Sequence, residues 1–219
     1  MLTFAVPDLH GRLDLLEAAL AKIEARSRTG TVVFLGDYVD RGPDSKGVVE
    51  RLMLGPLGDW QWVCLQGNHE HMMVRALREH RPVGWLKNGG GPTLLSYGHV
   101  REGMLDYNIV PEAHLDWLAA RPIGHLDRYR IFVHAGLDHT LPLNEQNQRI
   151  VRSKIYPDDD TSDYAGRHVV HGHRPAAFVT SAGRTALDIY GRDRSSLLVA
   201  VFDDSRPGGP IEIISVSEP

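Results

Sequence analysis

Short runs of β-branched, aromatic and other apolar residues recur along the whole chain and constrain its fold more than any other feature. They cover residues 2–6, 32–35, 60–65, 130–133, 168–170, 197–202 and 211–216. Most are followed by Gly or Asp, which is typical of buried strands that end in turns. Segments with apolar residues at helical spacing lie between the early runs, at residues 13–23, 48–53 and 72–77, and Pro111 with Glu112 begins another. The glycines at 89–91 predict a loop. The order predicts an α/β protein with a mixed sheet, or two packed sheets, between helical layers.

Length and composition favour one domain covering residues 1–219, since 219 residues with 42% hydrophobic content can bury one sizeable core. The formal net charge of -4 argues against binding a nucleic acid polymer, which requires basic excess. The apolar runs are too short to cross a membrane, and the first residues do not resemble a signal peptide, so we expect a cytoplasmic protein without membrane association. Cys64 is the only cysteine, which excludes an intrachain disulfide and a cysteine zinc cluster, and it lies inside an apolar run as a core residue would.

Polar side chains that can bind metals follow successive apolar runs. They are Asp8 and His10, then Asp37 and Asp40, then Asn68 and His69, then His134, then His171 and His173. In α/β sheets, ligands gather outside the carboxyl ends of the strands, so these groups should meet. Carboxylate, imidazole and amide groups suit Mn, Fe, Zn or Mg. There are more groups than one ion needs, and a central carboxylate can bridge two cations about 3.5–4 Å apart. The sequence therefore predicts a two-metal enzyme that hydrolyses a phosphate ester.

Each motif alone also has a structural explanation. Asp8 to His10 and Asn68 could form a turn or a helix cap, Asp37 and Asp40 could be turn residues, and His134 could be a buried core histidine. Their joint occurrence in order favours the metal centre. Competing motifs fail: Met73 stands where a zinc-protease helix beginning at His69 needs its second His, and the sequence contains neither a phosphate-binding Gly-Lys-Ser/Thr loop nor a Gly-x-Ser-x-Gly elbow.

These motifs closely resemble those of a known family. The blocks Gly36-Asp37-Tyr38-Val39-Asp40-Arg41-Gly42, Gly67-Asn68-His69-Glu70, His134-Ala135-Gly136 and Gly172-His173 follow Asp8-Leu9-His10 in order. The chain is thereby similar to the phosphoprotein phosphatase branch of the calcineurin-like metallophosphoesterases, particularly the small bacterial and phage serine/threonine phosphatases. The resemblance implies a four-layer α-β-β-α sandwich with mixed sheets.

The resemblance also implies two divalent metal ions, with Mn as the first candidate and Fe, Zn or Mg as alternatives. Asp8, His10 and Asp37 would hold the first ion. Asp37 would bridge to the second ion, which Asn68, His134 and His173 would complete. His171 is two residues before His173, hence on the same strand face, and we expect it to support the site or the core rather than bind metal.

Further residues receive roles from the same resemblance. His69 would be the general acid, with Asp40 orienting its ring. Arg41 and Arg152 would bind phosphate oxygens, with Arg149 as the alternative to Arg152. Arg174 replaces the family's usual Thr and would add a cation that favours a more anionic substrate.

The expected reaction is in-line attack on phosphorus by a metal-bridging hydroxide without a phosphoenzyme, because no nucleophilic Cys or Ser motif is present. The expected substrate is a phosphoprotein or a small phosphorylated molecule, first a phosphoserine or phosphothreonine protein, with phosphotyrosine still open. The main alternative is a dinucleoside polyphosphate, as in the symmetrical diadenosine tetraphosphatases. A catalytically dead metal-binding scaffold is a further alternative, which the presence of Asp37, Asp40 and His69 disfavours. The sequence does not indicate which oligomeric state the protein has.

Overall fold

The computed structural model describes residues 1–99, 105–157, 160–173, 179–187 and 195–218. These residues form two five-stranded sheets, in the orders β10-β9-β1-β2-β3 and β4-β5-β6-β8-β7. The first sheet contains β1 (Leu2–Val6), β2 (Gly30–Phe34), β3 (Trp60–Cys64), β9 (Ser196–Asp203) and β10 (Glu212–Ser217). The second contains β4 (Gly124–Leu126), β5 (Arg130–Val133), β6 (His168–His171), β7 (Val179–Thr180) and β8 (Arg184–Ala186). The helical segments are α1 (Leu13–Arg26), α2 (Ser45–Leu54), α3 (Asn68–Arg78), α4 (Val83–Trp85), the π-helical turn η1 (Leu86–Gly90), α5 (Gly91–Ser96), α6 (Glu112–Ala119), the 3-10 turn η2 (Leu143–Glu145) and α7 (Gln148–Ser153).

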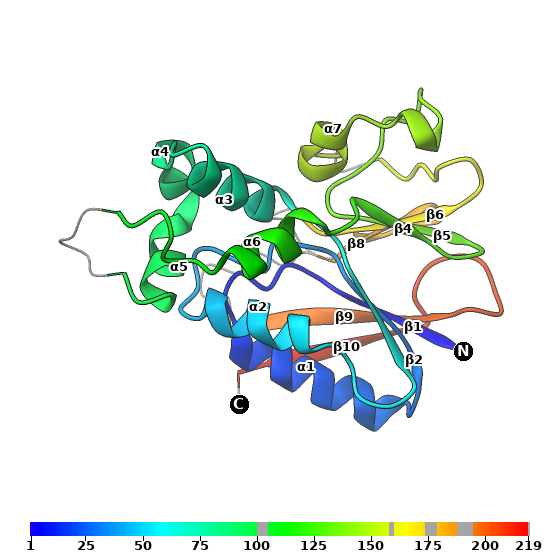
Figure 1. Cartoon of the computed structure of the whole chain (residues 1–219). Helices are drawn as coiled ribbons and strands as arrows, with labels where there is room; N and C mark the ends of the chain where they lie inside the picture. Colours follow the sequence, from blue (N-terminus) through cyan, green and yellow to red (C-terminus); the bar gives the residue numbers. More distant parts are fainter. Residues whose placement is uncertain (100–104, 158–159, 174–178, 188–194, 219) are drawn as a thin grey trace.

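The two sheets pack face to face between helices (Figure 1). Helices α1 and α2 cover the outer face of the first sheet, and α7 lies on the outer side of the second. Successive side chains of a strand point to opposite faces, which explains the layers. In β2, Val32 and Phe34 face the helices, whereas Val33 faces the second sheet. In β5, Phe132 meets the first sheet and Ile131 faces the outer layer. The predicted four-layer α-β-β-α arrangement with mixed sheets is confirmed.

Each sheet contains three neighbouring parallel strands, β1, β2 and β3 in the first and β5, β6 and β8 in the second, and this determines where the loops gather. β1 pairs in parallel with β2, and β2 with β3, so that Val6 lies opposite Phe34 and Phe34 opposite Cys64. β5 and β6 are also parallel, with Phe132 opposite Val170. The loops that follow these strands therefore leave from common edges, as the sequence pattern predicts.

Some sequence-based expectations for local structure are wrong. The short strands β4, β7 and β8 carry few of the apolar residues that mark the other strands and were not predicted. The glycines at 89–91 do not form a loop, because Gly89 and Gly90 end η1 and Gly91 begins α5. Gly89 has a φ of 106°, a conformation that glycine tolerates, and the helical path is kinked at this residue. Cys64 is buried as expected, and burial raises the pKa of its thiol to about 12, which keeps it protonated and non-nucleophilic.

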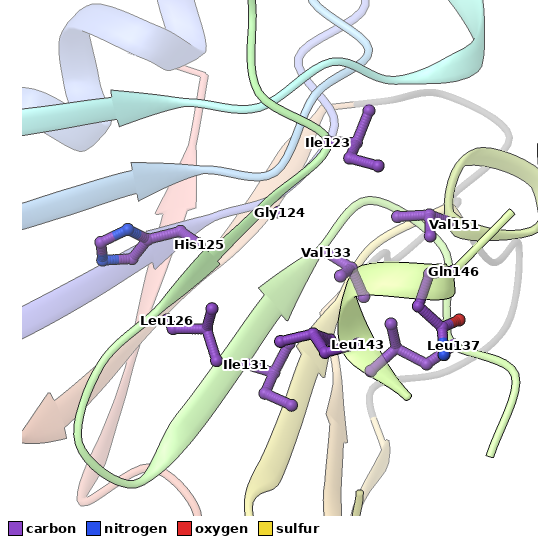
Figure 2. A pocket seen from close by; sticks show the side chains of 10 residues that line it. All are labelled: Ile123, Gly124, His125, Leu126, Ile131, Val133, Leu137, Leu143, Gln146 and Val151. Atoms are coloured by element: carbon purple, nitrogen blue, oxygen red, sulfur yellow. The ribbon is translucent and has the colours of Figure 1, made fainter. Parts of the chain in front are cut away.

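An apolar pocket of about 170 Å³ opens beside the β4–β5 hairpin (Figure 2). Its lining is mostly aliphatic, including Ile131, Leu137 and Leu143, and the ring of His125 points away from these side chains. This lining provides no carboxylate and no pair of histidines, so the pocket is not a candidate metal centre. In the described parts of the chain, no helix combines the length and apolar character that crossing a membrane requires.

Candidate metal centre

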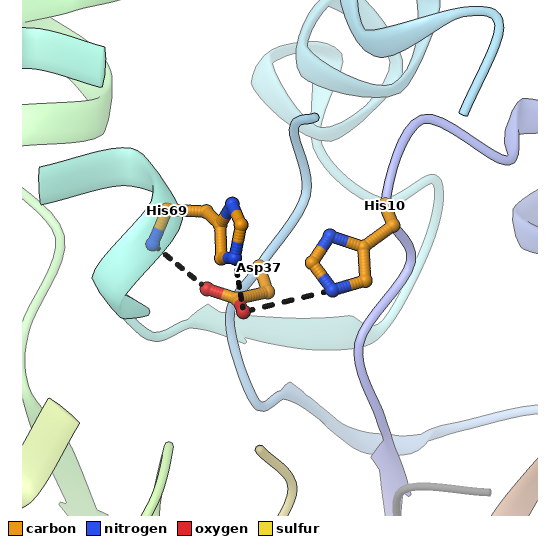
Figure 3. Close-up of side chains that lie close together, drawn as sticks. All are labelled: His10, Asp37 and His69. Atoms are coloured by element: carbon orange, nitrogen blue, oxygen red, sulfur yellow. Dashed lines mark hydrogen bonds and ion pairs between the residues drawn. The ribbon is translucent and has the colours of Figure 1, made fainter. Parts of the chain in front are cut away.

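Asp37 lies at the centre of the residues that follow the parallel strands. It comes from the loop after β2 and is only 2% exposed. Its Oδ2 atom lies 3.7 Å from Nε2 of His10 and 3.8 Å from Nε2 of His69 (Figure 3). Its Oδ1 atom lies 3.4 Å from Nε2 of His134. The Asp37 carboxylate is therefore surrounded by imidazoles from three different segments of the chain.

Two groups of side chains could each hold a metal ion, and they share Asp37. The first is His10, Asp37 and His69, and the second is Asp37, His134 and His173, with the ligand atoms in each group within 4.8 Å of one another. The second group joins both sheets, since Asp37 follows β2 and the two histidines follow β5 and β6. A shared carboxylate between two groups is the arrangement that a two-metal centre needs.

The geometry around His134 fits a cation. Its Nδ1 lies 2.9 Å from the carbonyl oxygen of Leu35, so Nδ1 carries a proton and Nε2 would present its lone pair to a metal ion once its own proton leaves. From Nε2 the distances are 3.0 Å to Asn68 Oδ1, 3.1 Å to His173 Nδ1 and 3.4 Å to Asp37 Oδ1. Two ligand atoms each about 2.1 Å from one ion lie about 3.0 Å apart in an octahedron and about 3.4 Å apart in a tetrahedron. Lone pairs this close repel unless a cation or a proton lies between them.

A backbone carbonyl orients the ring of His10 in the same way as that of His134. Its Nδ1 donates to the carbonyl oxygen of Val39 over 2.9 Å, leaving the Nε2 lone pair directed at the site. Burial is the main cause that lowers the pKa of His10 well below its usual value, so the ring is neutral, as a metal ligand must be. Arg41 Nη1 lies 2.8 Å from this Nε2, and Oδ2 of Asp8 lies 3.9 Å from it. A cation is therefore already directed at the position that a first metal would take.

His69 differs from the other histidines in its partner. Its Nδ1 lies 2.7 Å from Oδ2 of Asp40, a carboxylate rather than a carbonyl, and both side chains are buried. Burial lowers the pKa of His69, but the Asp37 charge and the hydrogen bond to Asp40 outweigh it and raise that pKa. A ring that retains its proton is suited to donate one, with its Nε2 free to face a reacting group.

The backbone at the site adopts conformations that are uncommon for residues with side chains. Among the described non-glycine residues, positive φ occurs at the predicted site residues His10, Asp37, Asp40, Arg41 and His173, and otherwise at His80 and Ala165. Such conformations cost about 1–3 kcal/mol each and are concentrated at functional sites. Gly67 allows the loops to meet, because a Cβ there would lie 2.1 Å from Asp37 Oδ1.

Glu70 organises the site, although no role was predicted for it. Its buried carboxylate accepts backbone N–H bonds from Gly67 at 2.9 Å, Asp37 at 2.8 Å and Tyr38 at 2.7 Å. It thereby joins the loop after β2 to the start of α3. Burial, followed by the Asp37 charge, raises the pKa of Glu70 to about 7, although the backbone N–H donors act to lower it. The signal in the sequence was its place three residues after Gly67, the position of a capping-box acid.

The remaining predicted site residues are placed as follows. Asp8 accepts the backbone N–H of His173 over 3.3 Å. Arg152 is buried and donates to Oε1 of Gln66 over 2.7 Å, beside the loop that leads to Asn68, whereas Arg149 is exposed.

His171 is buried with its Nε2 3.2 Å from Nη1 of Arg184, and burial lowers its pKa to about 3. The two metal-capable groups do not include it. This position agrees with the expectation that it supports the core. Arg174 lies outside the described residues.

The donor set and its support fit divalent cations. Carboxylate oxygens, imidazole nitrogens and one amide oxygen converge, and the far-side N–H groups of His10 and His134 are bonded to backbone carbonyls. The sequence of this chain matches the model of the family described as calcineurin-like phosphoesterase over residues 1–202. The chain belongs to this family. The family predicted from the motifs is therefore confirmed.

Relatives of this phosphoesterase carry two kinds of name. It is 33% identical over 87 residues to serine/threonine-protein phosphatase 1 of Salmonella typhimurium, covering 40% of this chain and 38% of that protein. It is 28% identical over 186 residues to the symmetrical bis(5'-nucleosyl)-tetraphosphatase of Neisseria gonorrhoeae, covering 81% of this chain and 58% of that protein. The chain thus spans less than two thirds of the length of each of these curated relatives. A solved structure described as a proposed diadenosine tetraphosphatase has a TM-score of 0.65 at 23% identity and covers 100% of this chain and 94% of its own, which shows a shared fold.

Proposed function

We propose that this calcineurin-like phosphoesterase hydrolyses phosphomonoesters as a metal-dependent serine/threonine protein phosphatase. The observation that carries the proposal is the buried Asp37 carboxylate, which lies near His10 on one oxygen and His134 on the other, beside the His69–Asp40 pair. Two divalent cations bound there would polarise the phosphoryl group and lower the pKa of water. Mn is the first ion to test, followed by Fe, Zn and Mg.

The proposed roles of the side chains are those that the family motifs imply. Asp8, His10 and Asp37 would hold one ion. Asp37, Asn68, His134 and His173 would hold the other. His69 would donate the proton on its Nε2 to the leaving oxygen, since Nδ1 is bonded to Asp40. Arg41 and Arg152 would bind phosphate oxygens, and the planar paired donors of arginine suit that task.

A symmetrical dinucleoside tetraphosphatase activity has equal support. The alignment with the Neisseria gonorrhoeae enzyme of that name covers twice as much of this chain, 81% against 40% for the Salmonella typhimurium phosphatase. The same residues could act on either substrate, because the reacting group in both is a phosphoryl centre.

One set of assays tests the proposal. Protein stripped with a chelator and reloaded with Mn, Fe, Zn or Mg is given a phosphothreonine peptide, a phosphotyrosine peptide and diadenosine tetraphosphate, and its metal content is measured. We expect two ions per chain and hydrolysis of the phosphothreonine peptide. Asp37→Asn should lose bound metal, and His69→Asn should retain metal and lose turnover by about 10²–10⁴-fold. Asp59→Asn, at an exposed position, is the matched control. Preferential cleavage of the dinucleotide would replace the protein phosphatase proposal, and an inert metal-loaded protein would refute both.

A further inference from the structure

The Asp40 carboxylate receives more hydrogen bonds than its pairing with His69 requires. It is 0% exposed, so no solvent competes for it. Nε1 of Trp85 donates to both of its oxygens, over 2.8 Å to Oδ1 and 2.9 Å to Oδ2. The hydroxyl of Thr93 donates to Oδ1 over 2.8 Å. His69 Nδ1 takes the remaining side of Oδ2 at 2.7 Å. The plane of the carboxylate is therefore fixed by donors that come from α4 and α5.

Thr93 also fixes the backbone of Asp40. Its Oγ1 accepts the N–H of Asp40 over 2.9 Å, and Oγ of Ser45 lies 2.9 Å away. Since the Thr93 proton is directed at the carboxylate, Ser45 is the donor in that last bond. Asp40 has a φ of 75°, an uncommon conformation for a residue with a side chain, and this network holds it there.

Trp85 is fitted tightly into this position. It is 2% exposed, and a Cβ on Gly90 would lie 2.5 Å from Cε2 of its ring. The indole therefore packs directly on a glycine backbone. Glycine at position 90 and tryptophan at position 85 together set the direction of the indole N–H.

We propose that Trp85 and Thr93 are positioning residues that fix the Asp40 carboxylate so that His69 is oriented to protonate the leaving group. The inference rests on the proposed phosphatase function. A buried carboxylate that loses one of its donors turns toward the others, because an unsatisfied buried charge is costly. His69 Nδ1 would follow Oδ2, and its Nε2 would leave the line of the departing oxygen.

Two substrates with different leaving groups test this proposal. Phenyl phosphate needs a proton on its departing oxygen, whereas p-nitrophenyl phosphate releases a stabilised anion that does not. Trp85→Phe keeps the ring and removes the N–H. We expect turnover of phenyl phosphate by this variant to fall at least about tenfold, within the range of general acid catalysis, and turnover of p-nitrophenyl phosphate to change by less than about threefold. Thr93→Val should behave alike, and Thr93→Ser should restore phenyl phosphate turnover.

The control is Trp62→Phe, the same substitution at a partly buried indole that packs on Phe34 in the first sheet. It should leave the ratio of the two turnover numbers unchanged. Equal losses on both substrates would show a merely structural role and overturn the proposal, as would no loss on either. If Trp85→Phe does not fold, the comparison of Thr93→Val with Thr93→Ser tests the proposal by the same ratio of turnover numbers. Wild-type protein that cleaves neither ester would instead refute the phosphatase function itself.

Discussion

Nε2 of His134 lies 3.4 Å from Oδ1 of Asp37, and both side chains are buried. Burial alone lowers the pKa of His134, but the Asp37 charge and the hydrogen bond to it outweigh burial and raise that pKa to about 10. Without metal, a proton therefore occupies the space between the two groups. His173 is already neutral, since burial and the charge on His134 lower its pKa to about 4.

Metal binding should release the His134 proton, because a ligand nitrogen must be deprotonated. At pH 8 we expect about one proton per chain from this ring, and metal affinity should rise with pH up to about 10. Calorimetric titration of metal-free protein in buffers of different ionisation enthalpy measures the released proton. His134→Asn should abolish this proton release, and a wild-type affinity that does not depend on pH would contradict the prediction.

The same group should make the stability of the metal-free protein depend on pH. The folded pKa of about 10 is above the ordinary value of 6.5, so the stabilisation from protonated His134 is fully present below pH 6.5 and is lost as pH rises through about 10. The free energy of unfolding should therefore fall between pH 7 and pH 10. Urea unfolding across this range measures it, and His134→Asn should show a flatter profile. Equal slopes in both proteins would argue against a protonated His134.

Gly67→Ala should weaken metal binding by at least about tenfold. The added Cβ would lie 2.1 Å from Asp37 Oδ1 and 2.6 Å from the Asp37 nitrogen, so the shared carboxylate must move. Overpacking of this kind also costs about 1–3 kcal/mol of stability. Gly84→Ala is the matched control, because a Cβ there meets nothing within 4 Å. Metal titration and thermal unfolding of the two variants test this, and equal behaviour would contradict it.

Glu70→Gln should destabilise the protein although it keeps the shape of the side chain. Each Glu70 oxygen accepts two backbone N–H groups, Oε1 from Tyr38 and Val39 and Oε2 from Asp37 and Gly67. The amide nitrogen of glutamine cannot accept, so two buried donors lose their partner at about 1–3 kcal/mol each. Urea unfolding should show a loss of about 2–6 kcal/mol.

The control for this substitution is Glu112→Gln. Glu112 is 66% exposed and pairs with Arg78 at the surface, where ion pairs contribute about 0–1 kcal/mol. A Glu70→Gln variant as stable as the Glu112→Gln variant would show that Glu70 does not hold the two loops together.

The residues that converge on Asp37 could be predicted because parallel strands bring their following loops to one edge, and the motifs stand at those loops. The roles of Glu70 and Trp85 could not be found in this way. Glu70 follows β3 in the Gly67–Glu70 block, but its role depends on how the loop after β2 packs against it. Trp85 lies in α4, which does not directly follow a strand. The strand β8 was missed because Arg184 and Thr185 are polar, yet both are buried against neighbouring residues.

The Asp37–His134–His173 group takes its members from loops of both sheets. An ion held there would cross-link the two sheets at the end where these loops meet. Loading the protein with metal should then slow amide exchange at the carboxyl ends of β2 and β5, in the absence of any substrate. In this family member the catalytic ion would also be a structural link between the halves of the sandwich.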